Sequence, residues 1–401
     1  MFYWYKKSTL LVLAVGLGLT ACTSAAPQAL PTESNAPEPA PVIKTATSLP
    51  TEPAPSGAEA EFSTDFNKHS VPYDEILSGG PSKDGIPPID NPTYDSVSDA
   101  NAWLNDREPV VLVQVGDEAR AYPLQILTWH EIVNDTFGDK PLVVSFCPLC
   151  NTAIAFERTF NGQVLDFGTT GRLRYSNLIM YDRQTETWWQ QATGDAIAGE
   201  LTGTQLAFYP ASIISWADFK TQYPEGSVLS KETGYNRSYG RNPYPGYDDI
   251  SQSPFLYTGE LYVDQLPAMA RVLTIELEDE TVAYPYDVLR EQGVVNDEVG
   301  GESAAIFWVA GTASALDTAT IEDGQDVGAA LAYLRQVAGR TLSFTVNDGI
   351  IRDNETGSIW NIFGQATAGE LEGETLPPII SVNHFWFSWA AFQPETRIYQ
   401  P

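Results

Sequence analysis

Two stretches of the sequence decide the expected fold, because the second repeats the first. Residues 121–135 read AYPLQILTWHEIVND, and residues 283–297 read AYPYDVLREQGVVND. The second stretch begins 162 residues after the first and repeats its Tyr122, Pro123, Leu127, Val133, Asn134 and Asp135. Similarity at a fixed offset is typical of a duplicated structural unit. The sequence therefore predicts two copies of one unit.

Further blocks extend this repeat along the chain. The paired blocks are 151–153 with 311–313, 182–189 with 353–360, 194–203 with 364–373, and 215–219 with 388–392. Blocks that keep their order in both halves, with small drifts in offset, are hard to obtain by chance. We expect residues shared by the two copies to be structural, and residues present in only one copy to carry chemistry.

Short apolar runs separated by turn residues predict mostly strands. The expected strands are 110–115, 119–122, 141–146, 153–160 and 163–167, with Asn161-Gly162 as a strong hairpin signal, and short helices are expected over 124–133 and 212–222. The sequence thus predicts a mainly β fold (α+β with short helices). We expect an internally duplicated, pseudo-symmetric architecture of two β-rich copies.

Composition divides the chain into five segments. They are a lipoprotein signal peptide (1–21), a disordered Pro/Ala-rich tether (22–60), the first copy (61–235), a connection rich in Tyr, Pro and Gly (236–268), and the second copy (269–401). The tether holds almost no large apolar residues, so it has little surface to bury against the entropy of ordering.

The N-terminus has the pattern of an exported lipoprotein. Lys6 and Lys7 precede an apolar run from Leu10 to Leu19, whose helix would be about 15 Å long, roughly half the thickness of the hydrocarbon core. The run leads into Leu-Thr-Ala-Cys22, which resembles a lipobox with Cys22 as the lipid attachment point. We expect an extracytoplasmic protein of the cell envelope, anchored to a membrane through lipid. The alternative is an ordinary secretory signal followed by a chance cysteine.

The charge of the chain argues against one class of partner. The formal net charge is −30, and no basic cluster is visible. A nucleic-acid-binding protein needs a basic surface that neutralises phosphates. We therefore expect no nucleic acid as partner, while the sequence leaves protein partners and any substrate open.

Comparison of the two copies points to one candidate site. Cys147 corresponds to Phe307 and Cys150 to Ala310, while His130 corresponds to Gln292. The first copy therefore has two cysteines and a histidine where the second has none.

The segment Cys147-Pro148-Leu149-Cys150 has three interpretations. As a metal knuckle, it would supply two sulfur ligands to zinc, iron or copper. As a redox dithiol, it would place Cys147 before a helix whose dipole lowers the thiol pKa. As a structural element, it would hold a disulfide that closes a tight turn. We prefer the knuckle, because residues 151–160 alternate like a strand and not like a helix.

Further metal ligands must come from elsewhere in the chain. His130 is the first candidate. His384 is a lesser one, which the pseudo-symmetry would have to bring near the cysteines. Met180 is expected in the core, and His69, near the tether, on the surface.

Several of these motifs together resemble a known family. The motifs are Ser78–Pro87, Ala121–Leu124, Trp129–Asp135, Cys147–Cys150 with Thr152-Ala153, Leu178–Arg183 and His384–Phe392. In these motifs the chain resembles the DUF3179 family, a domain of unknown function, from about residue 70 to residue 400. The resemblance implies that the Trp-His-Glu and Cys-Pro-Leu-Cys blocks belong to the family pattern. At Asn151 this sequence departs from the glycine expected there.

The leading functional hypothesis is a lipid-anchored metal-binding or redox protein of the cell envelope, an oxidoreductase if it is an enzyme. It rests on Cys147 and Cys150, with His130 assisting. One alternative is a non-catalytic binding or structural module with a Cys147–Cys150 disulfide. The other is a thiol–disulfide exchange protein, marked by labile cysteines.

Overall fold

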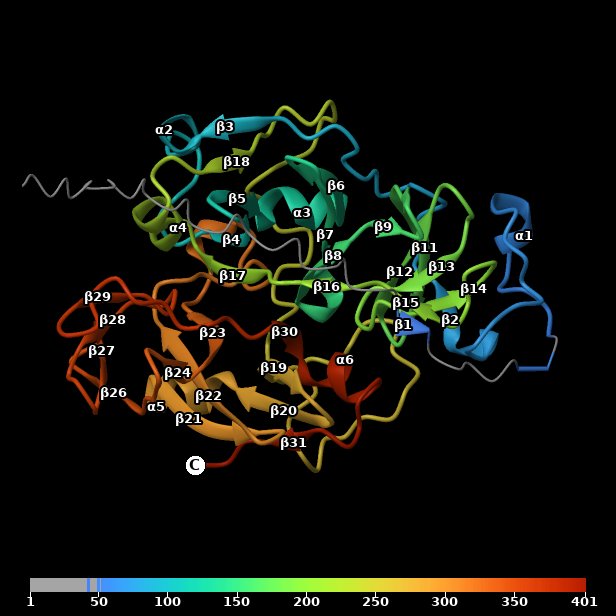
Figure 1. The fold of residues 1–401 in the computed structure, drawn as a ribbon. Helices are drawn as coiled ribbons and strands as arrows, with labels where there is room; N and C mark the ends of the chain where they lie inside the picture. Colours follow the sequence, from blue (N-terminus) through green and yellow to red (C-terminus); the bar gives the residue numbers. More distant parts are fainter. Residues whose placement is uncertain (1–41, 44–48, 51) are drawn as a thin grey trace, which may run out of the picture. The chain divides into compact units, whose positions relative to one another are not determined.

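The computed structural model describes residues 42–43, 49–50 and 52–401 (Figure 1). The predicted signal peptide, residues 1–21, and Cys22 lie outside the described residues. Residue contacts place Pro41–Pro401 in a single compact unit. In the part of the chain that the structure describes, no helix has the length and apolar character needed to cross a membrane.

The first half of the described chain consists mostly of short antiparallel strands. Its elements are β1 (Val42–Ile43), α1 (Ala58–Glu61), η1 (Tyr73–Glu75), β2 (Ile76–Ser78), β3 (Tyr94–Ser96), α2 (Val97–Ala100), β4 (Pro109–Val115), β5 (Glu118–Pro123), α3 (Leu124–His130), β6 (Ile132–Phe137), β7 (Lys140–Cys147), η2 (Pro148–Cys150), β8 (Thr152–Glu157), β9 (Thr159–Phe160), β10 (Gln163–Val164), β11 (Phe167–Arg174), β12 (Asn177–Asp182), β13 (Trp188–Gln190), β14 (Ala196–Ala198), β15 (Thr204–Gln205), β16 (Phe208–Tyr209), β17 (Ser212–Ser215), α4 (Trp216–Gln222) and β18 (Ser227–Leu229).

The second half follows the connecting segment and again consists mostly of strands. Its elements are β19 (Arg271–Leu277), β20 (Glu280–Pro285), α5 (Tyr286–Gln292), β21 (Val294–Val299), β22 (Glu302–Val309), η3 (Ile321–Asp323), β23 (Ala329–Leu334), β24 (Gln336–Val337), β25 (Arg340–Thr341), β26 (Phe344–Asn347), β27 (Ile350–Asp353), β28 (Ile359–Trp360), β29 (Ala366–Ala368), β30 (Ser381–Phe385), α6 (Trp386–Ala390) and β31 (Arg397–Ile398). The predicted mainly β fold is confirmed.

The two halves share a sheet plan. In the first half a sheet has the order β17-β4-β5-β18-β3, and in the second a sheet has the order β30-β19-β20-β31. In both sheets all neighbours are antiparallel except one pair, β18 with β5 and β31 with β20. Along the chain, both halves have the same order of elements: a hairpin, a short helix and a second hairpin. These are β4–β5, α3 and β6–β7 in the first half, and β19–β20, α5 and β21–β22 in the second.

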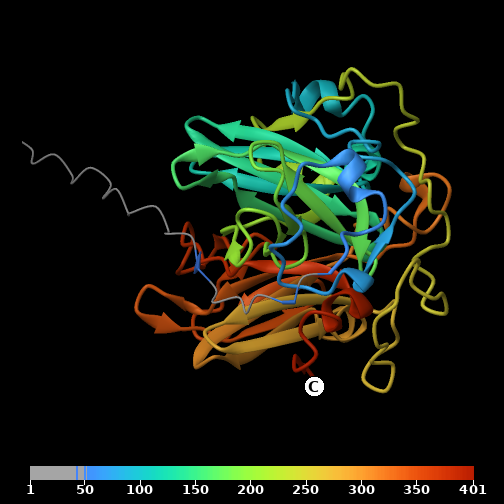
Figure 2. The ribbon, with the colours of Figure 1, turned by 90° about the vertical axis from the view of Figure 1, so that its right-hand side faces the viewer.

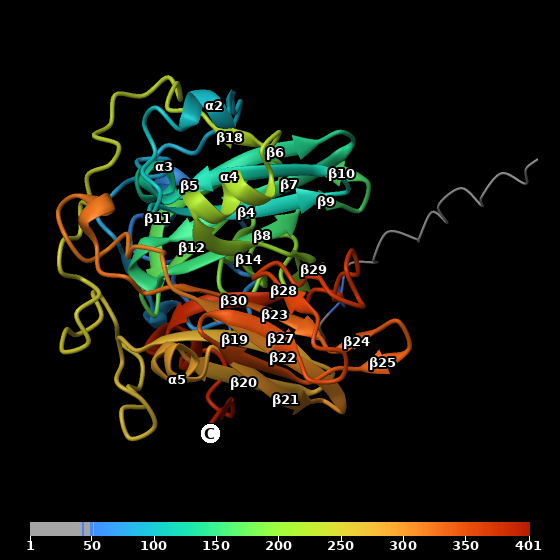
Figure 3. The same ribbon diagram turned by 90° about the vertical axis from the view of Figure 1, so that its left-hand side faces the viewer.

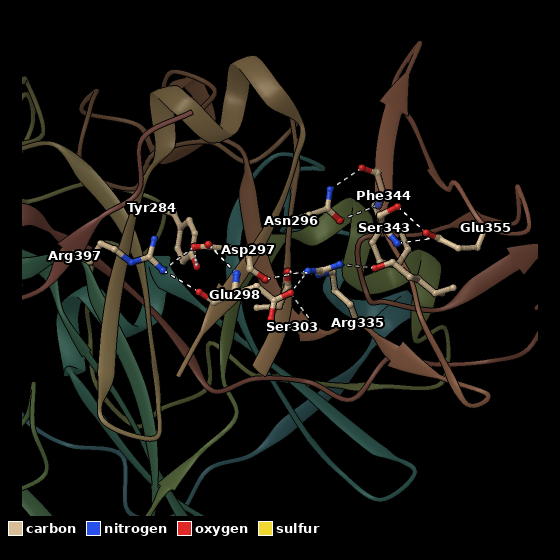
Figure 4. A network of polar contacts seen from close by, with 12 residues as sticks. Tyr284, Asn296, Asp297, Glu298, Ser303, Arg335, Ser343, Phe344, Glu355 and Arg397 are labelled. Atoms are coloured by element: carbon tan, nitrogen blue, oxygen red, sulfur yellow. Dashed lines mark hydrogen bonds and ion pairs between the residues drawn. The ribbon is translucent and has the colours of Figure 1, made fainter. Parts of the chain in front are cut away.

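Matching side chains fix these sheets to their neighbours. In the second half the Asn296 amide accepts from the Phe344 N–H and donates to the Phe344 carbonyl, both at 2.9 Å or less (Figure 4). In the first half Asn134 makes the same two bonds with Phe167, both at 2.8 Å. Likewise Tyr284 donates to Asp297 where Tyr122 donates to Asp135. The two halves thus share these side-chain contacts, and the predicted duplication stays a prediction.

Two helices predicted from sequence were too long. The first, 124–133, ends at His130 because Glu131 takes a left-handed conformation, φ 58°, after which β6 begins. The second, 212–222, starts only at Trp216. Its first residues form β17, paired with β4, and the Ser215 hydroxyl caps α4 by accepting from the Asp218 N–H at 3.0 Å.

The folded part also begins earlier than predicted. Of the predicted tether 22–60, Ala58 is fully buried in α1, and a Glu52 carboxylate oxygen accepts from the Tyr73 N–H at 2.8 Å. These contacts show that Glu52 and Ala58, which lie in the predicted tether, belong to the folded part.

The two halves share hydrophobic core. One buried cluster joins Val110 and Trp216 of the first half to Phe307 and Trp360 of the second. A second cluster surrounds Cys147 and Cys150 in the first half. The cysteines therefore lie inside the folded unit, where their side chains have almost no contact with solvent.

Candidate functional site

Two neighbouring thiols form the centre of the site. Cys147 ends β7, residues 148–150 make a single 3₁₀ turn, and β8 starts at Thr152. Both cysteines are free, and their exposed fractions are 2% and 0%. The expected strand is confirmed as β8, and the single 3₁₀ turn before it is not an α-helix whose dipole would lower the pKa of Cys147. Instead, burial and contact with the Cys150 thiol raise the pKa of Cys147 well above its ordinary value.

A hairpin turn binds both sulfurs. The Ser176 carbonyl oxygen lies 3.8 Å from Cys147 Sγ and 3.4 Å from Cys150 Sγ, and it accepts from both thiols. The Asn177 amide donates to Cys150 Sγ at 3.4 Å and to the Gln191 side chain at 2.9 Å. Ser176 lies in the turn between β11 and β12, and Asn177 is the first residue of β12, so the thiols are fixed by a hairpin distant in sequence.

A buried carboxyl group lies near enough to Cys147 to affect it electrostatically. Glu131 follows α3, and its carbonyl accepts from the N–H of Phe146, the residue before Cys147. Burial raises the pKa of Glu131 to about 8, and the carboxyl group in turn raises the pKa of Cys147. The Glu131 carboxyl makes no hydrogen bond with any residue in the described ranges. Such a group is held neutral over much of the neutral pH range and is free to exchange a proton.

Sequence reasoning missed Glu131, although the signal was present. Its counterpart in the second copy is Gly293, so Glu131 is a further residue found in one copy only. The comparison of the two copies in 'Sequence analysis' singles out cysteine and histidine at this site and does not include the acid beside them.

Strained backbone surrounds the thiols. Glu131, Asn151, Tyr175 and Ser176 all have positive φ, between 51° and 66°. The corresponding positions of the second half are Gly293, Gly311, Asp348 and Gly349, three of them glycines that adopt such angles without cost. Side-chain-bearing residues in this region typically cost of order 1 kcal/mol or more each and gather at functional sites. The first half therefore has side-chain-bearing residues at positive φ where the second half has mostly glycine, and this difference points to the same site without reference to the cysteines.

Asn151 explains the one departure from the family pattern. It has φ 52° and ψ 38°, the left-handed conformation. Glycine is the usual residue there, and asparagine is among the few other residues that tolerate it. The turn after Cys150 therefore keeps a glycine-like geometry.

The histidines are placed differently from the prediction. The ring nitrogens of His130 lie 2.7 Å from the Pro87 carbonyl and 2.6 Å from the Tyr239 hydroxyl, so both are engaged away from the thiols. His384 is the histidine that reaches the cysteine turn. Its Nδ1 lies 2.8 Å from Thr152 Oγ1, and the same hydroxyl lies 3.2 Å from the Cys150 carbonyl.

The remaining candidates lie in the core. Burial lowers the pKa of His384 to about 3, and its Nε2 has no partner among the described residues. His69 was expected on the surface, which is wrong. It is 2% exposed because it stacks on Tyr73 and its Nδ1 bonds to the Val71 carbonyl at 2.9 Å. Met180 is buried, as expected.

The donor set does not match the predicted metal knuckle. Over the described ranges, no three His, Cys, Asp or Glu side chains are grouped so that they could hold a metal ion. The site contains two sulfurs and one nearby carboxyl group, while His130 bonds to Pro87 and Tyr239 and His384 bonds to Thr152 through Nδ1 alone. Whether the purified protein carries a metal stays a prediction.

The fold and the site together define a mainly β protein with a buried dithiol on one of two similar halves. The family model described as "Protein of unknown function (DUF3179)" matches residues 83–396. The match covers most of the chain, so the chain belongs to the DUF3179 family, as its motifs indicated. No curated protein and no solved structure matches the chain.

Proposed function

We propose that this chain is a dithiol–disulfide redox protein of the cell envelope, with Cys147 and Cys150 as the reactive pair. The observation that carries the proposal is the contact of two free thiols beside a buried carboxyl group without a hydrogen-bond partner among the described residues. The location follows the predicted signal peptide and the predicted lipid anchor at Cys22. Labelling of living cells with a radioactive fatty acid, lost in Cys22→Ser, tests that anchor.

The reaction transfers two electrons. One cysteine thiolate attacks a substrate disulfide, forming a mixed disulfide and releasing one substrate thiolate. The second cysteine thiolate then attacks the bonded cysteine sulfur, which forms the Cys147–Cys150 bond and releases the second substrate thiolate. The cysteines lose two electrons and two protons, and the substrate disulfide becomes two thiols.

Glu131 supplies a base that can take the proton from a buried thiol. Burial raises the pKa of Cys147, so little thiolate is present at neutral pH without a base. The Glu131 carboxylate is such a base, because its own pKa of about 8 is close to the working pH. In the reverse direction the protonated carboxyl group returns the proton to the leaving thiolate. The Ser176 carbonyl holds the two sulfurs side by side for bond formation.

The experiment uses the full chain carrying Cys22→Ser, so that Cys147 and Cys150 are its only cysteines. It is equilibrated with mixtures of reduced and oxidised dithiothreitol, and mass spectrometry scores the loss of two hydrogen atoms. We expect reversible formation of one internal disulfide, and a rate about 10²-fold lower in Glu131→Gln at pH 7.

Glu108→Gln is the matched control, because Glu108 is also buried and its pKa is also raised, but it bonds to Gln125 and Asn105 instead of lying near the thiols. Its rate should equal that of the parent. Thiols that stay reduced in oxidising buffer would overturn the proposal. So would a stoichiometric metal found by elemental analysis and lost in Cys147→Ser/Cys150→Ser, which would restore the predicted metal site.

A further inference from the structure

The segment that connects the two halves covers the dithiol. Residues 236–268 run along both halves on one side of the unit (Figures 2 and 3). Tyr244 and Tyr247 pack against the cluster that contains the cysteines. The Tyr247 hydroxyl donates to the Leu149 carbonyl at 3.0 Å, inside the cysteine turn. The near-complete burial of the thiols therefore depends in part on this segment.

Phe255 links the segment to the site at two points. Its N–H donates to the Tyr247 hydroxyl at 3.2 Å, and its carbonyl accepts from the Ser176 hydroxyl. Ser176 is the residue whose carbonyl binds both thiols. A displacement of Phe255 would therefore break bonds to both sides of the dithiol.

The same segment carries exposed apolar side chains. Of the eight large hydrophobic residues exposed in the described part of the chain, four lie in this segment, namely Ile250, Phe255, Leu261 and Val263, and Tyr235 directly precedes it. The Phe255 side chain is 52% exposed although its peptide group is bonded to the site. Apolar residues concentrated in this way are typical of contact surfaces for other molecules.

The charge of the segment limits the partner. The connecting segment has two exposed cations, Arg237 and Arg241, at its start. From residue 242 to residue 270 there is no Lys, Arg or His, while Asp249, Glu260 and Asp264 are exposed. An anionic lipid surface would be repelled by these carboxylates. A protein with apolar side chains bordered by Lys or Arg would be attracted.

We infer that the connecting segment is the docking surface for a protein disulfide, and that docking opens the dithiol. This inference rests on the redox function proposed above. The partner contacts Phe255 and Val263, displaces Phe255, and so releases the bonds that Tyr247 and Ser176 make over the turn. The partner's disulfide then exchanges with Cys147 and Cys150 by the two steps already given, leaving the partner with two thiols.

The test compares two synthetic peptides, each containing one internal disulfide, one Trp and one Leu. One peptide carries four Lys and the other four Glu at the same positions. The rate of Cys147–Cys150 oxidation is measured in the full chain with Cys22→Ser. We expect the Lys peptide to react at least 10-fold faster than the Glu peptide, with the difference shrinking as salt is added.

Substitutions on the surface locate the contact. Phe255→Ser and Val263→Ser should each slow oxidation by the Lys peptide at least fivefold. Val164→Ser is the control, because Val164 is 41% exposed but lies in the β9–β10 hairpin, and its rate should not change. Oxidised dithiothreitol oxidises every variant to the same extent if the redox function holds.

The outcomes separate the two proposals. Equal rates with both peptides, or rates unchanged by Phe255→Ser and Val263→Ser, would overturn the docking surface. Normal oxidation by oxidised dithiothreitol would then leave the redox function in place. Failure of every oxidant would overturn the redox function itself.

Discussion

At the scale of single residues, Glu131 is the most informative side chain. It is 8% exposed and has only burial to set its pKa, which rises from an ordinary value of 4.5 to about 8. Between these two pH values the folded chain holds a proton on Glu131 that the unfolded chain has released. The free energy of unfolding therefore falls as the pH rises through this window, with a slope that approaches about 1.4 kcal/mol per pH unit from this group.

Glu131→Gln removes that titration. We expect the variant to gain stability relative to the parent as the pH rises from 5 to 8, measured by urea unfolding at several pH values. Glu372→Gln, at an exposed carboxyl, serves as control and should follow the parent at every pH. A stability difference between Glu131→Gln and parent that stays constant over this range would contradict the buried, neutral carboxyl group.

The candidate site could be predicted from sequence only in part. Cys147 and Cys150 stood out because the second copy lacks them, and the strand after them followed from its alternation. The roles of His130 and His384 could not be predicted, because they depend on Tyr239 and Thr152, which approach from elsewhere in the fold. The role of Ser176 could not be predicted either, because its backbone carbonyl binds the thiols and its side-chain type gives no signal of this.

At the scale of elements, the hairpin turn at Ser176 has a useful counterpart. The β26–β27 turn places Asp348 and Gly349 at φ 52° and 74°, which suits a two-residue hairpin. The β11–β12 turn places Tyr175 and Ser176 at similar angles. The first half therefore accepts a strained turn where the second uses a relaxed one, which we attribute to the bonds that Ser176 makes.

Gly349→Ser measures the cost of a positive φ for a residue with a side chain, at a position where the added Cβ meets no other atom. No atom lies within 4 Å of a Cβ added at Gly349, so the cost is purely conformational. We expect the free energy of unfolding to fall by about 1 kcal/mol in urea unfolding. Gly349→Ala should lose the same amount, because it adds the same Cβ. Two variants as stable as the parent would remove the argument that the Ser176 turn is strained.

Most elements were predictable, and the errors have local causes. The β4–β5 hairpin and the Asn161-Gly162 turn were confirmed because their signals are local. The helix over 124–133 was extended too far because Ile132 and Val133 continue its apolar pattern while they belong to β6. The helix over 212–222 was begun too early because β17 obtains its partner from β4, about one hundred residues upstream.

At the scale of the whole molecule, the core joins the two halves. Phe307 of β22 is fully buried and belongs to the same cluster as Val110 and Trp216 of the first half. Thr152 and His384 add a polar contact between the halves beside the cysteines. A single copy would expose this shared surface, so we expect the two halves to unfold together.

Phe307→Ala tests this coupling at a distance. Phe307 occupies the position in the second half that corresponds to Cys147, and its ring contacts Tyr333 and Phe344. Truncation should cost about 3–5 kcal/mol by leaving a cavity. Because the halves share a core, tryptophan fluorescence and the labelling of Cys147 and Cys150 should move to the same lower urea midpoint. Thiols that stay protected to the parent's midpoint while fluorescence shifts would mean that the first half folds without the second. In that case the second half would be dispensable for the site.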